Sequence, residues 1–215
     1  MDNGIIQLIA IAIIPVIFAI TVHEFAHGWM ANQLGDATAR MMGRLTLNPV
    51  KHIDPVGTVL VPGLLLALGG FLFGWAKPVP VTWENLRQPR RDMMLVAVAG
   101  PMANLLMALF WALIMKLSFV FFNETVFTYP LFRMADLGVK INLILMLLNL
   151  LPLLPLDGGR ITHALLPPRL AYQYGRMENW GLVLILIMIP TGILAMILLP
   201  PMQAITSIIF GLFAL

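Results

Sequence analysis

The sequence HEFAH, at residues 23–27, places two histidines four residues apart with a glutamate directly after the first. Residues i and i+4 share one face of a helix, so the imidazoles of His23 and His27 can hold one metal ion, while Glu24 can reach a water beside it. A single histidine in a helix is more often a packed or solvated residue. Here two of only four histidines have metal-binding spacing in an apolar segment, where ionisable groups are typically functional. The motif therefore predicts a zinc site.

A catalytic zinc site needs a third protein ligand and one open coordination position. The chain contains no cysteine, so that ligand must be another histidine or a carboxylate. The candidates are His52, Asp54, Asp157 and His163. His52 and Asp54 lie in a loop rich in charged and turn-forming residues, where both side chains are ordinarily solvated or structural. We expect His163 on the cytoplasmic side, without a catalytic role.

Apolar segments must position these residues. The 215-residue chain is 60% hydrophobic and only 11% charged, against about a quarter charged in soluble domains. Its mean hydropathy of +0.92 also indicates an integral membrane protein. Apolar stretches cover 4–22, 57–74, 93–122, 137–156, 181–199 and 202–215, and the first five have about the ~20 residues that a spanning helix needs. Whether the last stretch crosses the bilayer stays open.

The basic residues indicate how the chain is oriented. Three Lys or Arg residues lie in 31–55, four in 75–92 and three in 157–179, but only one lies in 123–136. Because cytoplasmic loops carry the excess of positive charge, we place the three rich loops in the cytoplasm. The net charge of +3 is thus spread between apolar segments, which argues against a nucleic-acid partner.

Two of these basic loops flank the segment 57–74, so a full crossing there would put one of them outside. The segment is interrupted by Gly57, Pro62, Gly63, Gly69, Gly70 and Gly74. Such interruptions favour a chain that enters the membrane and turns back, which is tolerated where protein buries it. We predict a re-entrant hairpin, with a plain spanning helix as the alternative.

This topology gives each candidate ligand a depth. At 1.5 Å per residue, His23 and His27 lie ~29 to 35 Å along the first segment, near the cytoplasmic face. Both the first and the fourth segment start on the outer side, and Asp157 lies ~30 Å along the fourth. If 57–74 crossed fully, Asp157 would emerge on the opposite face. Matching depth therefore favours Asp157 as the third ligand.

Three motifs occur in a characteristic order: HEFAH (23–27), GPMAN (100–104) and NLLPLLPLDGG (149–159). Together they resemble the site-2 protease family of intramembrane zinc metalloproteases. The resemblance covers residues 15–165, followed by C-terminal helices at 180–215. The segments LNPVKHIDPVG and GWAKPVPV are similar to parts of the shorter bacterial members. We expect one domain over 1–215, without a PDZ or CBS domain.

The resemblance implies that one Zn²⁺ per chain is bound by His23, His27 and Asp157. It also implies that Glu24 is the general base of an endopeptidase, which cuts transmembrane protein substrates within or near their membrane segments, close to the cytoplasmic face. The chemistry agrees, since a carboxylate can take a proton from the attacking water and pass it to the departing amine. Pro and Gly residues around Asp157 favour an irregular backbone there.

Two asparagines are candidates to stabilise the oxyanion of the reaction, Asn149 first and Asn104 second. Asparagine also commonly forms hydrogen bonds between membrane helices, so a structural role is the alternative. The stretch RMMGRLTL (40–47) predicts a short strand and turn, a small membrane-associated β element on which an extended substrate could pair. GWAKPVPV (74–81) is a candidate substrate-side or gating loop.

The expected fold is therefore an all-α polytopic protein with five to six membrane segments, multi-pass in the cell membrane and surrounded by lipid. A second hypothesis is a metal transporter or membrane metal-binding protein, which would use intramembrane His and Asp but has no need for Glu24. A third is a scaffold without activity, against which the intact set of His, Glu and Asp argues. The sequence leaves the substrate and the oligomeric state open.

Overall fold

The computed structural model describes residues 3–60, 64, 74–122 and 128–215, and this part of the chain is helical throughout its regular structure. The long helices are α1 (Asn3–Gln33), α4 (Pro89–Phe122), α5 (Thr128–Asn149) and α9 (Ile193–Phe213). The short ones are α2 (Thr38–Met41), α6 (Asp157–Leu165), α7 (Pro168–Gly175) and α8 (Glu178–Met188). Single turns of other helix types occur at η1 (Pro49–His52), η2 (Pro55–Leu60) and η3 (Trp83–Asn85).

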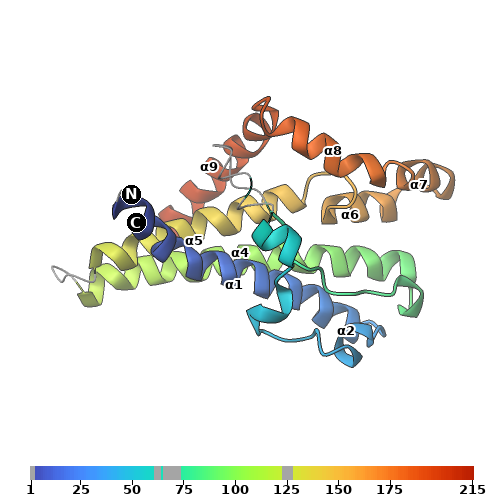
Figure 1. The fold of residues 1–215 in the computed structure, drawn as a ribbon, viewed down its shortest axis with the longest axis horizontal. Helices are drawn as coiled ribbons and strands as arrows, with labels where there is room; N and C mark the ends of the chain where they lie inside the picture. Colours follow the sequence, from blue (N-terminus) through green and yellow to red (C-terminus); the bar gives the residue numbers. More distant parts are fainter. Residues whose placement is uncertain (1–2, 61–63, 65–73, 123–127) are drawn as a thin grey trace.

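Three long helices, α1, α4 and α5, pack together and run alternately in opposite directions (Figure 1). The start of α1 and the end of α9 lie at one end of this bundle, whereas α2, α6 and α7 lie at the other. The second end also carries the loops with most of the basic residues. These loops therefore share one end of the bundle.

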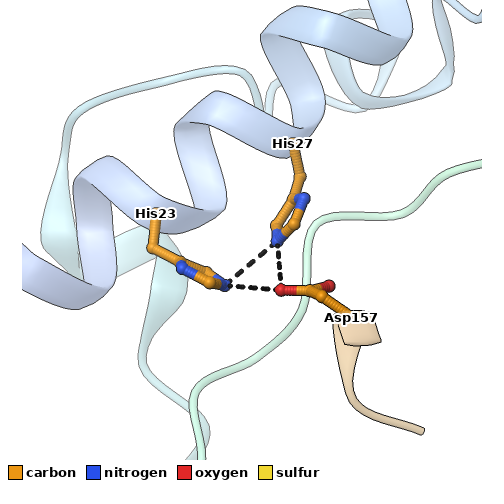
Figure 2. Close-up of side chains that lie close together, drawn as sticks. All are labelled: His23, His27 and Asp157. Atoms are coloured by element: carbon orange, nitrogen blue, oxygen red, sulfur yellow. Dashed lines mark hydrogen bonds and ion pairs between the residues drawn. The ribbon is translucent and has the colours of Figure 1, made fainter. Parts of the chain in front are cut away.

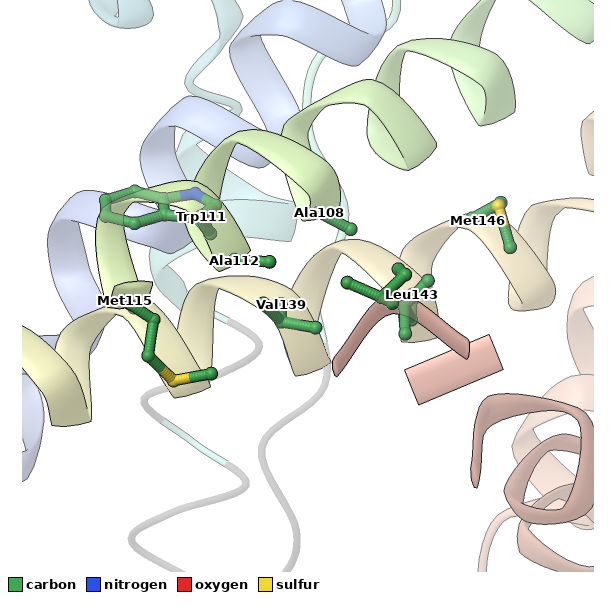
Figure 3. Close-up of a cluster of buried hydrophobic side chains, with 9 residues drawn as sticks. Ala108, Trp111, Ala112, Met115, Val139, Leu143 and Met146 are labelled. Atoms are coloured by element: carbon green, nitrogen blue, oxygen red, sulfur yellow. The ribbon is translucent and has the colours of Figure 1, made fainter. Parts of the chain in front are cut away.

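The bundle core lies between α4, α5 and α9 (Figure 3). Its buried members are Ala108, Trp111, Ala112, Met115, Ala135, Val139, Leu143, Met146 and Ile209. The alanines allow the helices to approach closely, as small residues do in membrane bundles. Gly138 extends this effect, because a Cβ atom there would lie 2.4 Å from the ring of Trp111.

The outer surface of the long helices is apolar. Large hydrophobic side chains such as Phe18, Leu106 and Ile208 are exposed, by 53%, 63% and 71%. In the described residues, the helical stretches Ala10–Gln33, Pro89–Phe121 and Ile193–Phe213 are long and apolar enough to cross a membrane. The chain is thus a helical membrane protein.

Helix boundaries differ from the apolar stretches in two places. Around the fourth stretch, the helix begins earlier and ends at Asn149, because the proline-containing residues 150–156 are not helical. In the C-terminal region the chain breaks at Gly192, whose φ of +76° suits glycine, rather than near Pro200 and Pro201, which lie inside α9.

Most of the segment 57–74 lies outside the described residues, and so does most of the predicted re-entrant hairpin. The two ends of the segment meet, however. The Trp75 N–H donates a hydrogen bond to the Gly57 carbonyl (3.0 Å), and the Thr58 hydroxyl donates to the Trp75 carbonyl (2.9 Å). The chain therefore leaves this segment beside the point where it entered.

The short strand predicted at 40–47 is not confirmed, and the described residues contain no strand. Arg40 and Met41 complete α2, and a turn follows at Gly43, whose φ is +62°. Asp36 explains the helix, because its carboxylate accepts a hydrogen bond from the Thr38 N–H (3.0 Å) and another from the Thr38 hydroxyl at the start of α2.

Asp36 also ties the end of α1 to the loop before α4. Its fully buried carboxylate accepts hydrogen bonds from the Thr82 N–H (2.7 Å) and the Asn85 amide (3.1 Å). Burial by itself raises the pKa of Asp36, but the hydrogen bonds from Thr38, Thr82 and Asn85 outweigh burial and hold the pKa below its usual range.

Candidate metal centre

His23 and His27 project from one face of α1 toward Asp157, the first residue of α6 (Figure 2). The Asp157 Oδ2 atom lies 3.3 Å from the Nε2 atom of each histidine, and the two Nε2 atoms are 3.0 Å apart. The three side chains are 9%, 12% and 13% exposed. Residues 130 or more positions apart in sequence thus converge on one nearly buried point.

The Nδ1 atom of each histidine, on the opposite side of the ring from Nε2, forms a hydrogen bond. The Nδ1 atom of His27 lies 2.8 Å from the Val96 carbonyl, which can only accept, so this nitrogen carries a hydrogen. The Nδ1 atom of His23 lies 2.6 Å from Oδ1 of Asn104. Because the Asn104 amide nitrogen donates to the Ala19 carbonyl (3.1 Å), its oxygen faces His23, which must be the donor. In a neutral imidazole with its hydrogen on Nδ1, the Nε2 atom carries a lone pair, so both Nε2 atoms are acceptors.

Three acceptor atoms therefore face one another without a hydrogen between them. Asp157 Oδ2 is buried and has no hydrogen-bond partner among the residues that the structure describes. Such an arrangement is repulsive unless a cation lies among the three atoms. With zinc–ligand distances of about 2.0–2.1 Å, the corners of a tetrahedron are about 3.3–3.4 Å apart, close to the separations found here. The site fits a zinc ion with two histidines and one carboxylate as ligands.

The position of Asp157 depends on the glycines that follow it. A Cβ atom on Gly158 would lie 2.3 Å from the Leu150 carbonyl oxygen, and one on Gly159 would lie 2.4 Å from the Leu154 nitrogen. A metal ion at this position would bind the Asp157 carboxylate in its anionic form.

The Glu24 carboxylate forms a hydrogen bond with a loop and not with Asp157. Its Oε2 atom accepts a hydrogen bond of 2.8 Å from the Val79 N–H, in the GWAKPVPV segment. That segment is anchored at Lys77. The Lys77 N–H donates to the His52 carbonyl (2.9 Å), and the Arg44 guanidinium donates to the Lys77 carbonyl (2.9 Å). The loop thus holds the glutamate carboxylate in place.

The other candidate ligands lie elsewhere. His52 is buried and its Nε2 donates to the Thr46 carbonyl (2.9 Å). Asp54 accepts hydrogen bonds from the N–H groups of Val56 (2.9 Å) and Gly57 (2.7 Å), and these bonds lie at the start of η2. Among the described residues, the only group that could hold a metal consists of His23, His27 and Asp157, so His163 is not part of it.

The two candidate oxyanion donors are placed differently. The side chain of Asn149 is half-buried, and its amide donates to the Leu145 carbonyl of its own helix (3.0 Å). Asn104 is fully buried behind His23, and both of its donors are engaged, by Ala19 and by Asn142 (3.0 Å). Asn104 therefore supports a histidine, which its sequence position alone does not reveal.

Gly100 is a site residue that the sequence analysis did not single out. A Cβ atom there would lie 2.3 Å from Nε2 of His27 and 2.6 Å from Cε1 of His23. Helix α4 therefore passes directly against the two imidazoles at this point. The only signal in the sequence was a Gly-Pro pair within an apolar helix, at the start of GPMAN.

Comparison with known proteins gives a consistent picture. Residues 11–140 match the family model described as "Peptidase family M50". The Bacillus subtilis protein named "Putative zinc metalloprotease YwhC" is 37% identical over 97% of this chain and 93% of its own. Rip2 of Mycolicibacterium smegmatis, which carries the same description, is 31% identical over 81% of this chain and 64% of its own. "Zinc metalloprotease MJ0392" of Methanocaldococcus jannaschii is 25% identical over 91% and 46%. No solved structure matches significantly.

Proposed function

Because the chain belongs to peptidase family M50, the site-2 proteases, it is an intramembrane zinc metalloprotease, and we propose that HEFAH and Asp157 form its catalytic centre. The convergence of His23, His27 and Asp157 on one buried point carries this proposal. The described residues contain one such group, which supports one zinc ion per chain. A zinc ion at this site would supply a Lewis acid for the scissile carbonyl and lower the pKa of water.

The residues around the site orient the metal ligands and transfer protons. His23 and His27 present their Nε2 lone pairs because Asn104 and the Val96 carbonyl hold the opposite nitrogens. Glu24 takes the proton of the attacking water and delivers it to the departing amine. The Val79 N–H orients this carboxylate by its hydrogen bond of 2.8 Å.

Asn149 is our proposal for a donor to the oxyanion of the reaction. It lies at the end of α5, on the segment that leads to Asp157. Its amide would have to exchange the Leu145 carbonyl for the substrate oxygen, which a half-buried side chain at a helix end can do. Asn104 lacks a free donor for this role.

We propose a multi-pass protein of the cell membrane, formed as one domain over 1–215, with the site near the cytoplasmic face. Three described helical stretches are long enough to span, and α5 and the 57–74 segment bring the membrane segments to five. The shorter apolar helix α8 would be a sixth. The bond between Trp75 and Gly57 supports a segment that returns to its starting side. The substrate is then a transmembrane protein that enters from the lipid.

No feature of the described residues favours the alternative of a metal transporter. The three ligands lie in one compact group, and Glu24 beside them has a role in hydrolysis but none in transport.

The experiment that tests the proposal is Glu24→Gln, with Glu84→Gln, an exposed residue of η3, as the matched control. Zinc content is measured in purified protein, and membrane-protein fragments are measured by mass spectrometry in cells expressing each variant. We expect Glu24→Gln to keep zinc and to lose the fragments, by about 10²- to 10⁴-fold in rate, as for other general bases. A Glu24→Gln variant that cuts as well as Glu84→Gln would contradict the proposal.

A further inference from the structure

A line of buried amide groups crosses three helices behind the metal centre. It begins with Asn142 of α5, continues with Asn104 of α4 and ends at His23 of α1. Both asparagines are 0% exposed. The amide of Asn142 donates to the Gly138 carbonyl (2.8 Å), the Asn104 amide donates to Oδ1 of Asn142 (3.0 Å), and His23 Nδ1 lies 2.6 Å from Oδ1 of Asn104.

The direction of every hydrogen bond in this line is fixed. The backbone carbonyls of Gly138 and Ala19 can only accept, so the amide nitrogens of both asparagines point toward them. Their oxygens then point along the line toward its other end. As a result, Asn142 supplies an acceptor to Asn104, and Asn104 supplies an acceptor to His23.

The two histidines differ in what holds them. His27 is held by the Val96 backbone carbonyl, which no side-chain substitution removes. The orientation of His23 depends on a side chain, and that side chain depends on another. Without the Asn142 oxygen, one buried N–H of Asn104 would have no acceptor, and the amide could satisfy it only by rotating away from its present position.

We infer that Asn142 is a positioning residue for the metal centre, which acts through Asn104 to hold His23 with its Nε2 lone pair toward the zinc ion. This inference rests on the proposed function. Partners of metal ligands beyond the direct ligands typically change metal affinity by about 10- to 100-fold when they are removed. Asn142 lies one residue further out, so we expect an effect near the lower value.

The test compares zinc dissociation constants, measured by chelator competition on purified protein in detergent. Asn142→Leu removes the acceptor at similar volume, whereas Asn142→Asp keeps an oxygen toward Asn104. Ser118→Ala is the control, because Ser118 is also fully buried in the bundle but donates only to the Met115 carbonyl of its own helix. We expect about tenfold weaker zinc binding for Asn142→Leu, and a change of less than about threefold for Asn142→Asp and Ser118→Ala.

A double variant separates positioning from a general loss of packing. If Asn142 acts through Asn104, zinc binding in Asn104→Leu should not weaken further when Asn142→Leu is added. The absorption spectrum of the Co²⁺-substituted protein provides a second readout, since it reports ligand geometry directly. We expect it to change in Asn142→Leu and to stay unchanged in Ser118→Ala.

Each outcome decides the matter. Wild-type zinc affinity in Asn142→Leu, or effects that multiply in the double variant, would overturn the inference while leaving the proposed function intact. A wild-type protein that binds no zinc would refute the proposed function and this inference with it. If Asn142→Leu does not fold, Asn142→Ser replaces it with the same expectation, because the serine hydroxyl is too short to reach Asn104.

Discussion

Replacing Gly100 by alanine would add a single methyl group at the face of α4 that lies against the two imidazoles. In the interior of an exposed helix this change stabilises by roughly 1 kcal/mol, because glycine is a poor helix former. At Gly100 the added Cβ atom would lie 2.3 Å from Nε2 of His27, the atom proposed to bind zinc. The substitution should therefore damage the site while it favours the helix.

The size of the effect follows from the distances. Ordinary van der Waals contact begins at about 3.4 Å, so Gly100 and the His27 nitrogen would have to separate by about 1.1 Å. Zinc sites tolerate deviations of only about 0.2 Å in ligand distance. A displacement about five times larger removes His27 as a ligand, and we expect zinc affinity to fall by about 100-fold or more, as for the loss of about 3 kcal/mol.

The assay is zinc binding by chelator competition, with thermal unfolding measured on the same samples. Gly211→Ala provides the matched control, since a Cβ atom there would contact nothing within 4 Å. Gly211→Ala should bind zinc like the wild type. If Gly100→Ala also bound zinc within about threefold of the wild type, the close packing of α4 against the histidines would be wrong.

Three further predictions concern the surroundings of the site. Val79→Pro removes the N–H that holds Glu24, so zinc content should stay unchanged while cleavage falls by about tenfold, part of what a general base contributes. Gly181→Ala would put a Cβ atom 1.4 Å from the Leu154 carbonyl oxygen, so the melting temperature should fall, as for overpacking by about 1–3 kcal/mol. Asp36 has a lowered pKa in the folded protein, so its contribution to stability is present above about pH 4 and lost as pH falls through the folded pKa. The difference in melting temperature between wild type and Asp36→Asn should therefore shrink in acid, and a difference that is constant from neutral pH to about pH 3 would refute this assignment.

The meeting of His23, His27 and Asp157 could be predicted from the sequence because it depends on regular quantities. Helical spacing places the two histidines on one face, and the rise per residue gives each segment a depth. The charge bias of the loops supplies the remaining constraint. None of these steps requires knowledge of how neighbouring helices pack against one another.

The supporting residues could not be predicted in the same way. Gly100 and Asn142 matter because α4 and α5 lie at particular distances from α1, which side-chain packing decides. For the same reason, Asn104 could be proposed as an oxyanion donor when its hydrogens are in fact engaged behind His23.

Helix ends were also difficult to place. Hydropathy does not register a single residue of positive φ, so the break at Gly192 was missed inside a continuous apolar region. The stretch 40–47 has the composition of a strand, but the local hydrogen bonds of Asp36 favour a helix at its start. In both places a local backbone feature overrides the pattern of hydrophobic residues.

The zinc-edge X-ray absorption spectrum of the purified protein, recorded beside that of Asp157→Ala, tests the central claim most directly. We predict one zinc ion per wild-type chain, with two imidazole nitrogens and a carboxylate oxygen at about 2.0–2.2 Å. The Asp157→Ala protein should bind zinc at least tenfold more weakly, or should show the loss of one oxygen ligand. An unchanged spectrum and zinc content in Asp157→Ala would contradict the three-ligand site on which the proposed function depends.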